Sequence, residues 1–145
     1  MLEAATWEEA CRIREGIDGL RCSRQTAGIL PRIRAVDRRI TPGLQDEGVV
    51  EGHPEVVLAV MANLRGLRHP KRLREGREER LALLRATFPD VDERLAGLAA
   101  GLRGDAVDAY ALLWTARRMV RGEAIRLPAG AVERDRRGLR CEMVA

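Results

Sequence analysis

The chain has 145 residues, of which 46% are hydrophobic and 33% are charged, a balance typical of one soluble globular domain. No apolar run reaches the roughly 18 residues of a membrane helix, and the amino terminus lacks the pattern of a signal peptide, so we expect a cytoplasmic protein with no membrane partner. The net charge of +4 is compatible with nucleic acid as a partner, whereas 3% aromatic residues argues against a protein that stacks on the bases of a single strand.

The first third of the chain is predicted to be helical. Thr6 and Glu9 have the spacing of a capping box, which predicts a short helix to about residue 15, and Ser23 can cap a second helix. Pro31 should kink or restart the second helix, and the segment 41–43 should stop it. This helix carries one apolar stripe, formed by Ile29, Ile33, Val36 and Ile40.

A strand is expected at about residues 48–52. Val49 and Val50 favour an extended chain, and Pro54 can open a helix that runs to about residue 63. Glu51 would then lie near the carboxyl end of the strand, where open α/β sheets usually place their sites. A lone strand cannot satisfy its backbone, so we expect it to pair with the tail of this chain or with strands of another chain.

The rest of the chain is predicted to contain a basic loop at residues 65–74, three further helices and a tail with strands at 125–128 and 139–144. The helices are expected at residues 75–87, after Pro89, and at residues 105–121. Their inward side chains are predicted from helical spacing to be Leu81, Leu84 and Phe88; Val91, Leu95, Leu98 and Leu102; and Leu112, Leu113, Ala116 and Val120.

Three acidic residues are candidate ligands of Mg²⁺ or Mn²⁺, which prefer carboxylate oxygens. Asp105 and Asp108 are three residues apart at a helix start and therefore share a face, and Glu51 could approach them from the strand. Two-metal nucleases need such converging carboxylates. The alternative for the two aspartates is helix capping and dipole compensation, and for Glu51 an exposed or ion-paired strand residue.

Three further residues allow two interpretations each. His53 is a candidate ligand or general base, or a histidine that is hydrogen-bonded at a turn. Glu55 follows Pro54, where it can compensate the helix dipole or act as a secondary site residue. Lys71 can neutralise phosphate, or lie solvated in the basic loop.

Several motifs in this order resemble one known family. They are Val50-Glu51-Gly52-His53-Pro54-Glu55, Lys71-Arg72, Asp105-Ala106-Val107-Asp108-Ala109, and the residues at 23–25, 29–34, 36–37, 75–77, 80–81, 114–118 and 137–142. Together they resemble the predicted nucleases with a ribonuclease-H-like fold that are known as domain of unknown function 429. The resemblance covers nearly the whole chain.

The resemblance implies an α/β fold with a metal-dependent phosphodiesterase site. Glu51 would match the acid of the fourth strand, Asp105 and Asp108 the acids of the last helix, and Lys71 with Arg72 a basic motif that binds substrate. Members of the family begin with strands that carry Gly-x-Asp-Gly, and this chain has no counterpart. We therefore expect one partial domain over residues 1–145, an incomplete ribonuclease-H-like fold that is rich in helices and has two or three short strands.

The resemblance suggests that the protein is a metal-dependent nuclease. The absence of the first-strand aspartate can make such a nuclease inactive. One alternative is a catalytically silent helical remnant that binds proteins or nucleic acid. Another is an enzyme of this fold that acts on a different phosphorylated substrate. Without the first strands, residues 48–52 would also be an exposed edge, which predicts a homo-oligomer or pairing with a separate N-terminal fragment.

Overall fold

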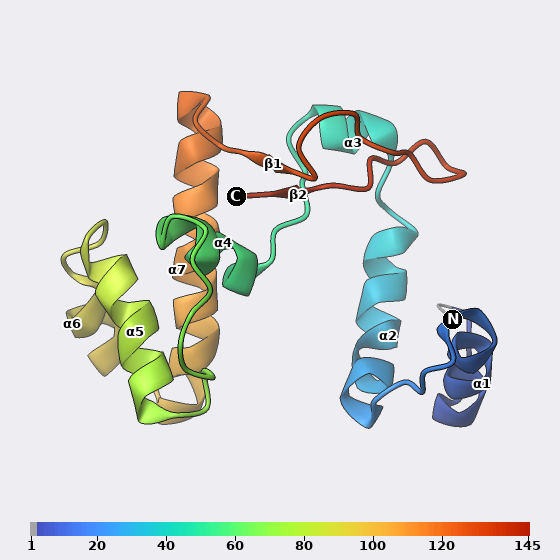
Figure 1. Ribbon diagram of the computed structural model, residues 1–145, viewed down its shortest axis with the longest axis horizontal. Coiled ribbons are helices and arrows are strands. Elements are labelled where there is room, and N and C mark those ends of the chain that lie inside the picture. The colour runs from blue at the N-terminus through green and yellow to red at the C-terminus, as the bar shows by residue number, and fades with distance from the viewer. Residues whose placement is uncertain (1–2) are drawn as a thin grey trace. The chain divides into compact units, whose positions relative to one another are not determined.

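The computed structural model describes residues 3–145 and divides the chain into two compact units, with the boundary between Glu47 and Gly48 (Figure 1). Each unit has its own hydrophobic core. The expectation of one partial domain stays a prediction. The two units are described separately below.

The first unit consists of three helices: α1 (Trp7–Asp18), α2 (Arg24–Asp37) and α3 (Pro42–Asp46). The predicted caps are confirmed, because the hydroxyl of Thr6 accepts the backbone N–H of Glu9 at 3.1 Å and the hydroxyl of Ser23 accepts that of Thr26 at 2.9 Å. α1 ends three residues later than predicted, at Gly19, whose φ of 73° is readily adopted by glycine.

Of the two alternatives predicted for Pro31, the restart is wrong, because Pro31 lies inside one continuous helix. The predicted stop at 41–43 agrees with the end of α2 at Asp37. The same segment also begins the next helix, because Thr41 caps α3 and Pro42 occupies its first turn.

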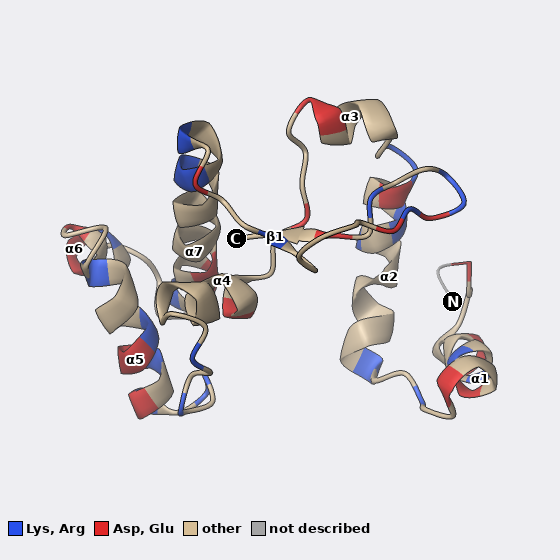
Figure 2. Cartoon of the chain, turned by 45° about the horizontal axis from the view of Figure 1, so that its top comes forward, with Lys and Arg blue, Asp and Glu red and all other residues tan. Residues whose placement is uncertain are grey.

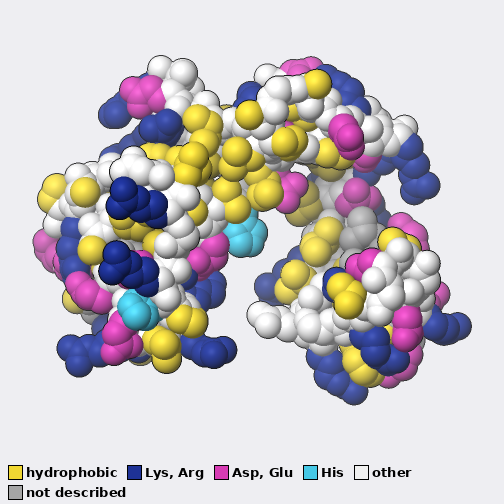
Figure 3. Space-filling model, in the orientation of Figure 1, with side chains coloured by type: hydrophobic (Ala, Val, Ile, Leu, Met, Phe, Trp, Pro, Cys, Tyr) yellow, Lys and Arg dark blue, Asp and Glu magenta, His cyan; other side chains and the backbone are white. Residues whose placement is uncertain are grey.

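The core of the first unit is small and lies between α1 and α2. It is formed by Ala4, Ala10, Cys11, Cys22 and Leu30, with Trp7 and Ile13 packed against it. The predicted stripe of α2 does not join this core. Ile29, Ile33 and Val36 are 45%, 40% and 63% exposed, and hydrophobic side chains of α2 reach the surface in the view of Figure 3.

In the second unit, α4 and α5 pack against the long helix α7, and α6 packs against α5. Its elements are α4 (Pro54–Met61), α5 (Arg74–Arg85), α6 (Val91–Ala96), a 3₁₀ turn η1 (Ala100–Leu102), α7 (Arg103–Arg121), β1 (Arg126–Leu127) and β2 (Met143–Val144). The strands pair in antiparallel fashion, with Arg126 opposite Val144. The tail strands are thus confirmed, although they are shorter than predicted.

The strand predicted at residues 48–52 is wrong. This segment is extended but makes a single backbone hydrogen bond to the tail, in which the N–H of Val144 donates to the carbonyl of Glu51 at 2.8 Å. A strand of only two residues, β2, offers too short an edge for a longer ladder. Association with a second copy or with another fragment through this segment remains a prediction.

The core of the second unit lies where α4 and α5 meet α7. Its largest fully buried side chains are Leu58, Leu84, Val57, Val91 and Val144. The side chains predicted to point inward from α5 are confirmed, and so are Val91 and Leu95 of α6. Leu98 and Leu102, which are predicted to continue this stripe, are exposed.

The prediction of which side chains of α7 point inward is wrong. Leu112, Leu113 and Val120 are exposed, Val120 by 90%, while Ala111 and Thr115 are buried. The small side chain of Ala111 allows α4 to approach α7 closely, so the buried face is turned by about one residue from the most apolar stripe. The helices and the single short sheet of the described residues confirm the prediction of a helix-rich chain with few short strands.

Candidate functional site

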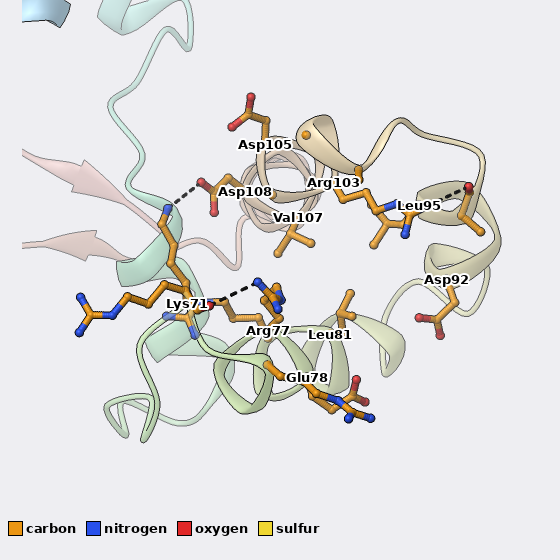
Figure 4. Close-up of a pocket in the computed structure, with 17 residues that line it drawn as sticks. Lys71, Arg77, Glu78, Leu81, Asp92, Leu95, Arg103, Asp105, Val107 and Asp108 are labelled. Atoms are coloured by element: carbon orange, nitrogen blue, oxygen red, sulfur yellow. Dashed lines mark hydrogen bonds and ion pairs between the residues drawn. The ribbon is translucent and has the colours of Figure 1, made fainter. Parts of the chain in front are cut away.

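A cleft of about 920 Å³ opens between α5, the segment from α6 to η1, and the start of α7 (Figure 4). Its apolar floor is formed by Leu81, Leu95 and Val107, which point into the space between the helices. Cations surround this floor, and they are Lys71, Arg72, Arg74, Arg77, Arg80 and Arg103. The acidic residues of the lining are Glu78, Asp92, Asp105 and Asp108.

Most of these acidic side chains are paired. Asp108 binds Lys71, with Oδ2 3.2 Å from Nζ. Glu78 and Asp92 both bind Arg85, which lies outside the cleft lining and approaches Asp92 with Nε 2.7 Å from Oδ2. The hydrogen bond from Arg85 lowers the pKa of the Asp92 carboxyl below its ordinary value. These carboxylates therefore do little to neutralise the remaining arginines of the cleft.

Four arginines of the cleft have no carboxylate partner within residues 3–145: Arg72, Arg74, Arg77 and Arg103. Arg77 donates to the carbonyl of Arg72 at 3.3 Å, and Arg103 donates to the carbonyls of Leu98 and Ala96 at 3.2 and 3.3 Å. A carbonyl orients a guanidinium but does not neutralise it. The cleft consequently presents positive charge on side chains that carbonyl groups help to orient (Figure 4). Lys and Arg positions are coloured along the chain in Figure 2.

Lys71 and Arg72 come from the loop between α4 and α5, and α5 holds this loop. The carboxylate of Glu79 accepts the backbone N–H groups of Arg68 and His69. The guanidinium of Arg80 donates to the carbonyl of His69 at 3.1 Å. The basic residues of the loop are thus attached to a regular helix.

The three predicted metal ligands are not gathered. Glu51 is exposed in the segment before α4, and Asp105 and Asp108 lie in the first two turns of α7. Asp105 points away from Val107, and Asp108 points toward Lys71 (Figure 4). Residues 3–145 contain no group of three or more His, Cys, Asp or Glu side chains that could hold a metal ion.

The other predicted site residues have different surroundings. His53 is the exposed residue before α4 and makes no capping bond with its side chain. Glu55 lies in the first turn of α4 and binds Arg80 with both carboxylate oxygens. Lys71 and Arg72 are exposed and line the cleft, as expected for residues that could bind phosphate.

The family model described as "Protein of unknown function (DUF429)" matches residues 1–133. The chain belongs to this family. The DUF429 match includes all residues that line the cleft and leaves out the last part of the tail, where β2 lies. No curated protein and no solved structure matches the chain.

The divalent metal that is expected from the sequence does not fit the acidic residues as they lie here. A two-metal site needs three or four converging carboxylates, whereas Asp108 is neutralised by Lys71 and Glu51 does not join the aspartates of α7. No helix within residues 3–145 is long and apolar enough to cross a membrane.

Sequence reasoning missed Arg77, Arg103, Glu79 and Arg80 as residues that build this cleft. Arg77 and Glu79 lie on the same helix as Leu81 and Leu84, and their helical spacing could have indicated a charged face beside the basic loop. Nothing in the sequence indicates the pairing of Arg80 with Glu55, because these residues are 25 positions apart.

Proposed function

We propose that this protein binds the phosphate backbone of nucleic acid in the cleft between α5 and α7. The observation that supports this function is a set of four arginines around the cleft that have no carboxylate partner in the described part of the chain: Arg72, Arg74, Arg77 and Arg103. A guanidinium offers a planar fork of N–H donors that matches two phosphate oxygens.

The composition of the cleft favours the backbone over the bases as the part of nucleic acid that is bound. The lining contains no aromatic side chain on which a base could stack. Contacts to phosphate fix the position of a strand but carry no sequence information directly. Binding is therefore expected to be independent of sequence and weakened by salt.

The direct test is a binding titration with a labelled DNA strand of about 20 nucleotides, a matched RNA and a duplex, in buffer of low ionic strength. We expect Arg77→Ala and Arg103→Ala each to weaken binding by about three- to tenfold, as the loss of one charge-assisted contact implies. Arg121→Ala is the control, because Arg121 ends α7 outside the cleft and the charge change is the same. Equal losses for Arg121→Ala and Arg77→Ala would contradict a specific role of the cleft.

Metal-dependent phosphodiester hydrolysis in a ribonuclease-H-like fold is the second candidate. It is suggested by the resemblance to predicted nucleases, and the observation that favours it is that Asp105 and Asp108 line the same cleft as the arginines. The test is cleavage of the same strands with Mg²⁺ or Mn²⁺ by the wild type and by Asp108→Asn. Cleavage that Asp108→Asn abolishes would support the nuclease, whereas binding without cleavage in either protein would support the binding function alone.

A further inference from the structure

We infer that Glu79 is a positioning residue for the cleft: it holds the loop at residues 65–73, which carries Lys71 and Arg72, in the arrangement that binds a polyanion. The inference rests on the proposed function. Glu79 would then promote the binding of an anion, although its negative charge alone would weaken that binding.

The carboxylate of Glu79 joins two consecutive N–H groups of the loop. The N–H of Arg68 lies 2.8 Å from Oε1 and 3.1 Å from Oε2, and the N–H of His69 lies 3.1 Å from Oε2. These donors belong to a segment without regular secondary structure, so the carboxylate supplies the partner that a helix or sheet would otherwise provide. The hydrogen bond from Arg68 is the largest cause that lowers the pKa of Glu79 below its ordinary value.

Arg80, the next residue of α5, binds the same part of the loop through a backbone carbonyl, whereas Glu79 binds it through backbone N–H groups. Its Nη1 donates to the carbonyl of His69 at 3.1 Å and to the carbonyl of Gly76 at 2.7 Å. The side chain of Arg80 is only 5% exposed and is fixed by Glu55. The loop is therefore bound by two consecutive side chains, one as acceptor and one as donor.

Gly76 lets the loop lie directly against α5. A Cβ at this position would lie 2.1 Å from the carbonyl oxygen of Pro70, so a larger residue would displace the backbone of the loop. Lys71 and Arg72 follow Pro70 immediately, and the carbonyl of Arg72 accepts a hydrogen bond from Arg77. The attachments at residues 68–70 thus fix the backbone directly before the two cations that line the cleft.

Charge and position predict opposite effects when Glu79 is replaced. Glu79→Ala removes a negative charge close to the cleft, which by itself would strengthen the binding of a polyanion. It also removes the acceptor of two N–H groups, which would release the loop and weaken binding. If Glu79 acts by position, the second effect is larger.

The experiment compares Glu79→Ala with Glu75→Ala, using a labelled oligothymidylate of about 20 nucleotides as the probe. Glu75 lies on the same helix, gives the same charge change and accepts no hydrogen bond from residues 65–73 in the described chain. We expect Glu79→Ala to bind about three- to tenfold more weakly than the wild type, Glu79→Gln, which keeps one acceptor oxygen, to lie between them, and Glu75→Ala to bind as well as the wild type or better. Binding by Glu79→Ala that equals or exceeds that of Glu75→Ala would overturn the inference.

Two further measurements separate positioning from a general structural role. In a Lys71→Ala/Arg72→Ala background, Glu79→Ala should not weaken binding, because the cations that it positions are gone and only its charge effect remains. A weakening as large as in the wild-type background would overturn the inference. Amide exchange at Arg68 and His69 should rise in Glu79→Ala while exchange in α7 stays unchanged, and unchanged exchange at Arg68 and His69 would also overturn it.

Failure of the proposed function would look different from failure of this inference. If the wild type does not bind the probe, the proposed function fails together with the role given to Glu79. If the wild type binds and Glu79→Ala binds equally well, the proposed function stands and only the positioning role is overturned.

Discussion

Arg80 of α5 and Glu55 of α4 form a two-pronged ion pair, with Nε 3.1 Å from Oε1 and Nη2 2.6 Å from Oε2. The guanidinium is almost completely buried, and its third nitrogen donates to the carbonyls of His69 and Gly76. One side chain therefore connects α4, α5 and the basic loop. It also follows that Arg80, although it lines the cleft, is already satisfied by the protein.

Replacement of Arg80 should strongly destabilise the second unit. Arg80→Met keeps much of the side-chain volume but leaves Glu55 and two carbonyls without their donor. We expect a loss of about 2–4 kcal/mol in the free energy of unfolding, below the value for a fully buried pair because Glu55 is partly exposed. Urea denaturation measures it, with Arg80→Lys expected to recover only part of the loss. A change of less than about 0.5 kcal/mol in Arg80→Met would contradict this role.

Gly76→Ala should also destabilise the protein, by roughly 1–3 kcal/mol, because the added methyl group would overlap the carbonyl of Pro70. Gly104→Ala is the matched control. No atom lies within 4 Å of a Cβ at Gly104, which is in the first turn of α7, so alanine there should be neutral or stabilising by up to about 0.5 kcal/mol. Equal thermal unfolding midpoints for the two variants would show that the loop does not pack on α5 at Gly76.

The contribution of Glu79 to stability should depend on pH. Its pKa in the folded protein is lowered, first by the N–H of Arg68 and further by the N–H of His69 and the charges of His69 and Arg80, while burial opposes these effects. A group with a lowered folded pKa stabilises the fold above its unfolded pKa, and this stabilisation is lost as the pH falls through the folded pKa. The stability difference between wild type and Glu79→Gln should therefore be constant near neutral pH, begin to fall near the ordinary pKa of 4.5, and reach its smallest value below the lowered pKa of the folded protein. A stability difference that does not change with pH would contradict this contribution of the Glu79 carboxylate.

Asp108→Asn should strengthen the binding of nucleic acid while changing stability little. In its pair with Lys71, the lysine is 61% exposed and the aspartate 28%, and solvent-exposed pairs contribute about 0–1 kcal/mol. Removal of the carboxylate frees Lys71 for phosphate, so the affinity for a labelled strand should rise by about two- to fivefold. Weaker binding, or binding that requires Mn²⁺ in the wild type only, would favour the role of Asp108 as a metal ligand.

Local signals in the sequence predicted the local features of the fold. Thr6 and Ser23 could be predicted as helix caps because each hydroxyl accepts a hydrogen bond from the backbone N–H three residues later, in the first turn of the same helix. Leu84 of α5 and Val91 of α6 are buried as expected from helical spacing, and so is Phe88, which lies between these two helices.

Features that depend on packing between distant segments could not be predicted in the same way. The stripe of Leu112 and Val120 is the more apolar face of α7, but the face with the small residue Ala111 is the one that α4 covers. The charge of the cleft also depends on tertiary pairing, because Arg85 binds Glu78 and Asp92, seven residues away on either side, and Arg77 has no carboxylate partner within residues 3–145.

The salt dependence of binding tests the central claim most directly. The logarithm of the affinity for a labelled DNA strand should fall linearly with the logarithm of salt concentration in the wild type, with a slope of about −0.7 for each phosphate contacted. In the variant Arg72→Ala/Arg74→Ala/Arg77→Ala, we expect weaker binding and a slope that is smaller in magnitude by about 2–3. A wild-type affinity that does not respond to salt, or a slope that the three substitutions leave unchanged, would contradict phosphate binding by this cleft.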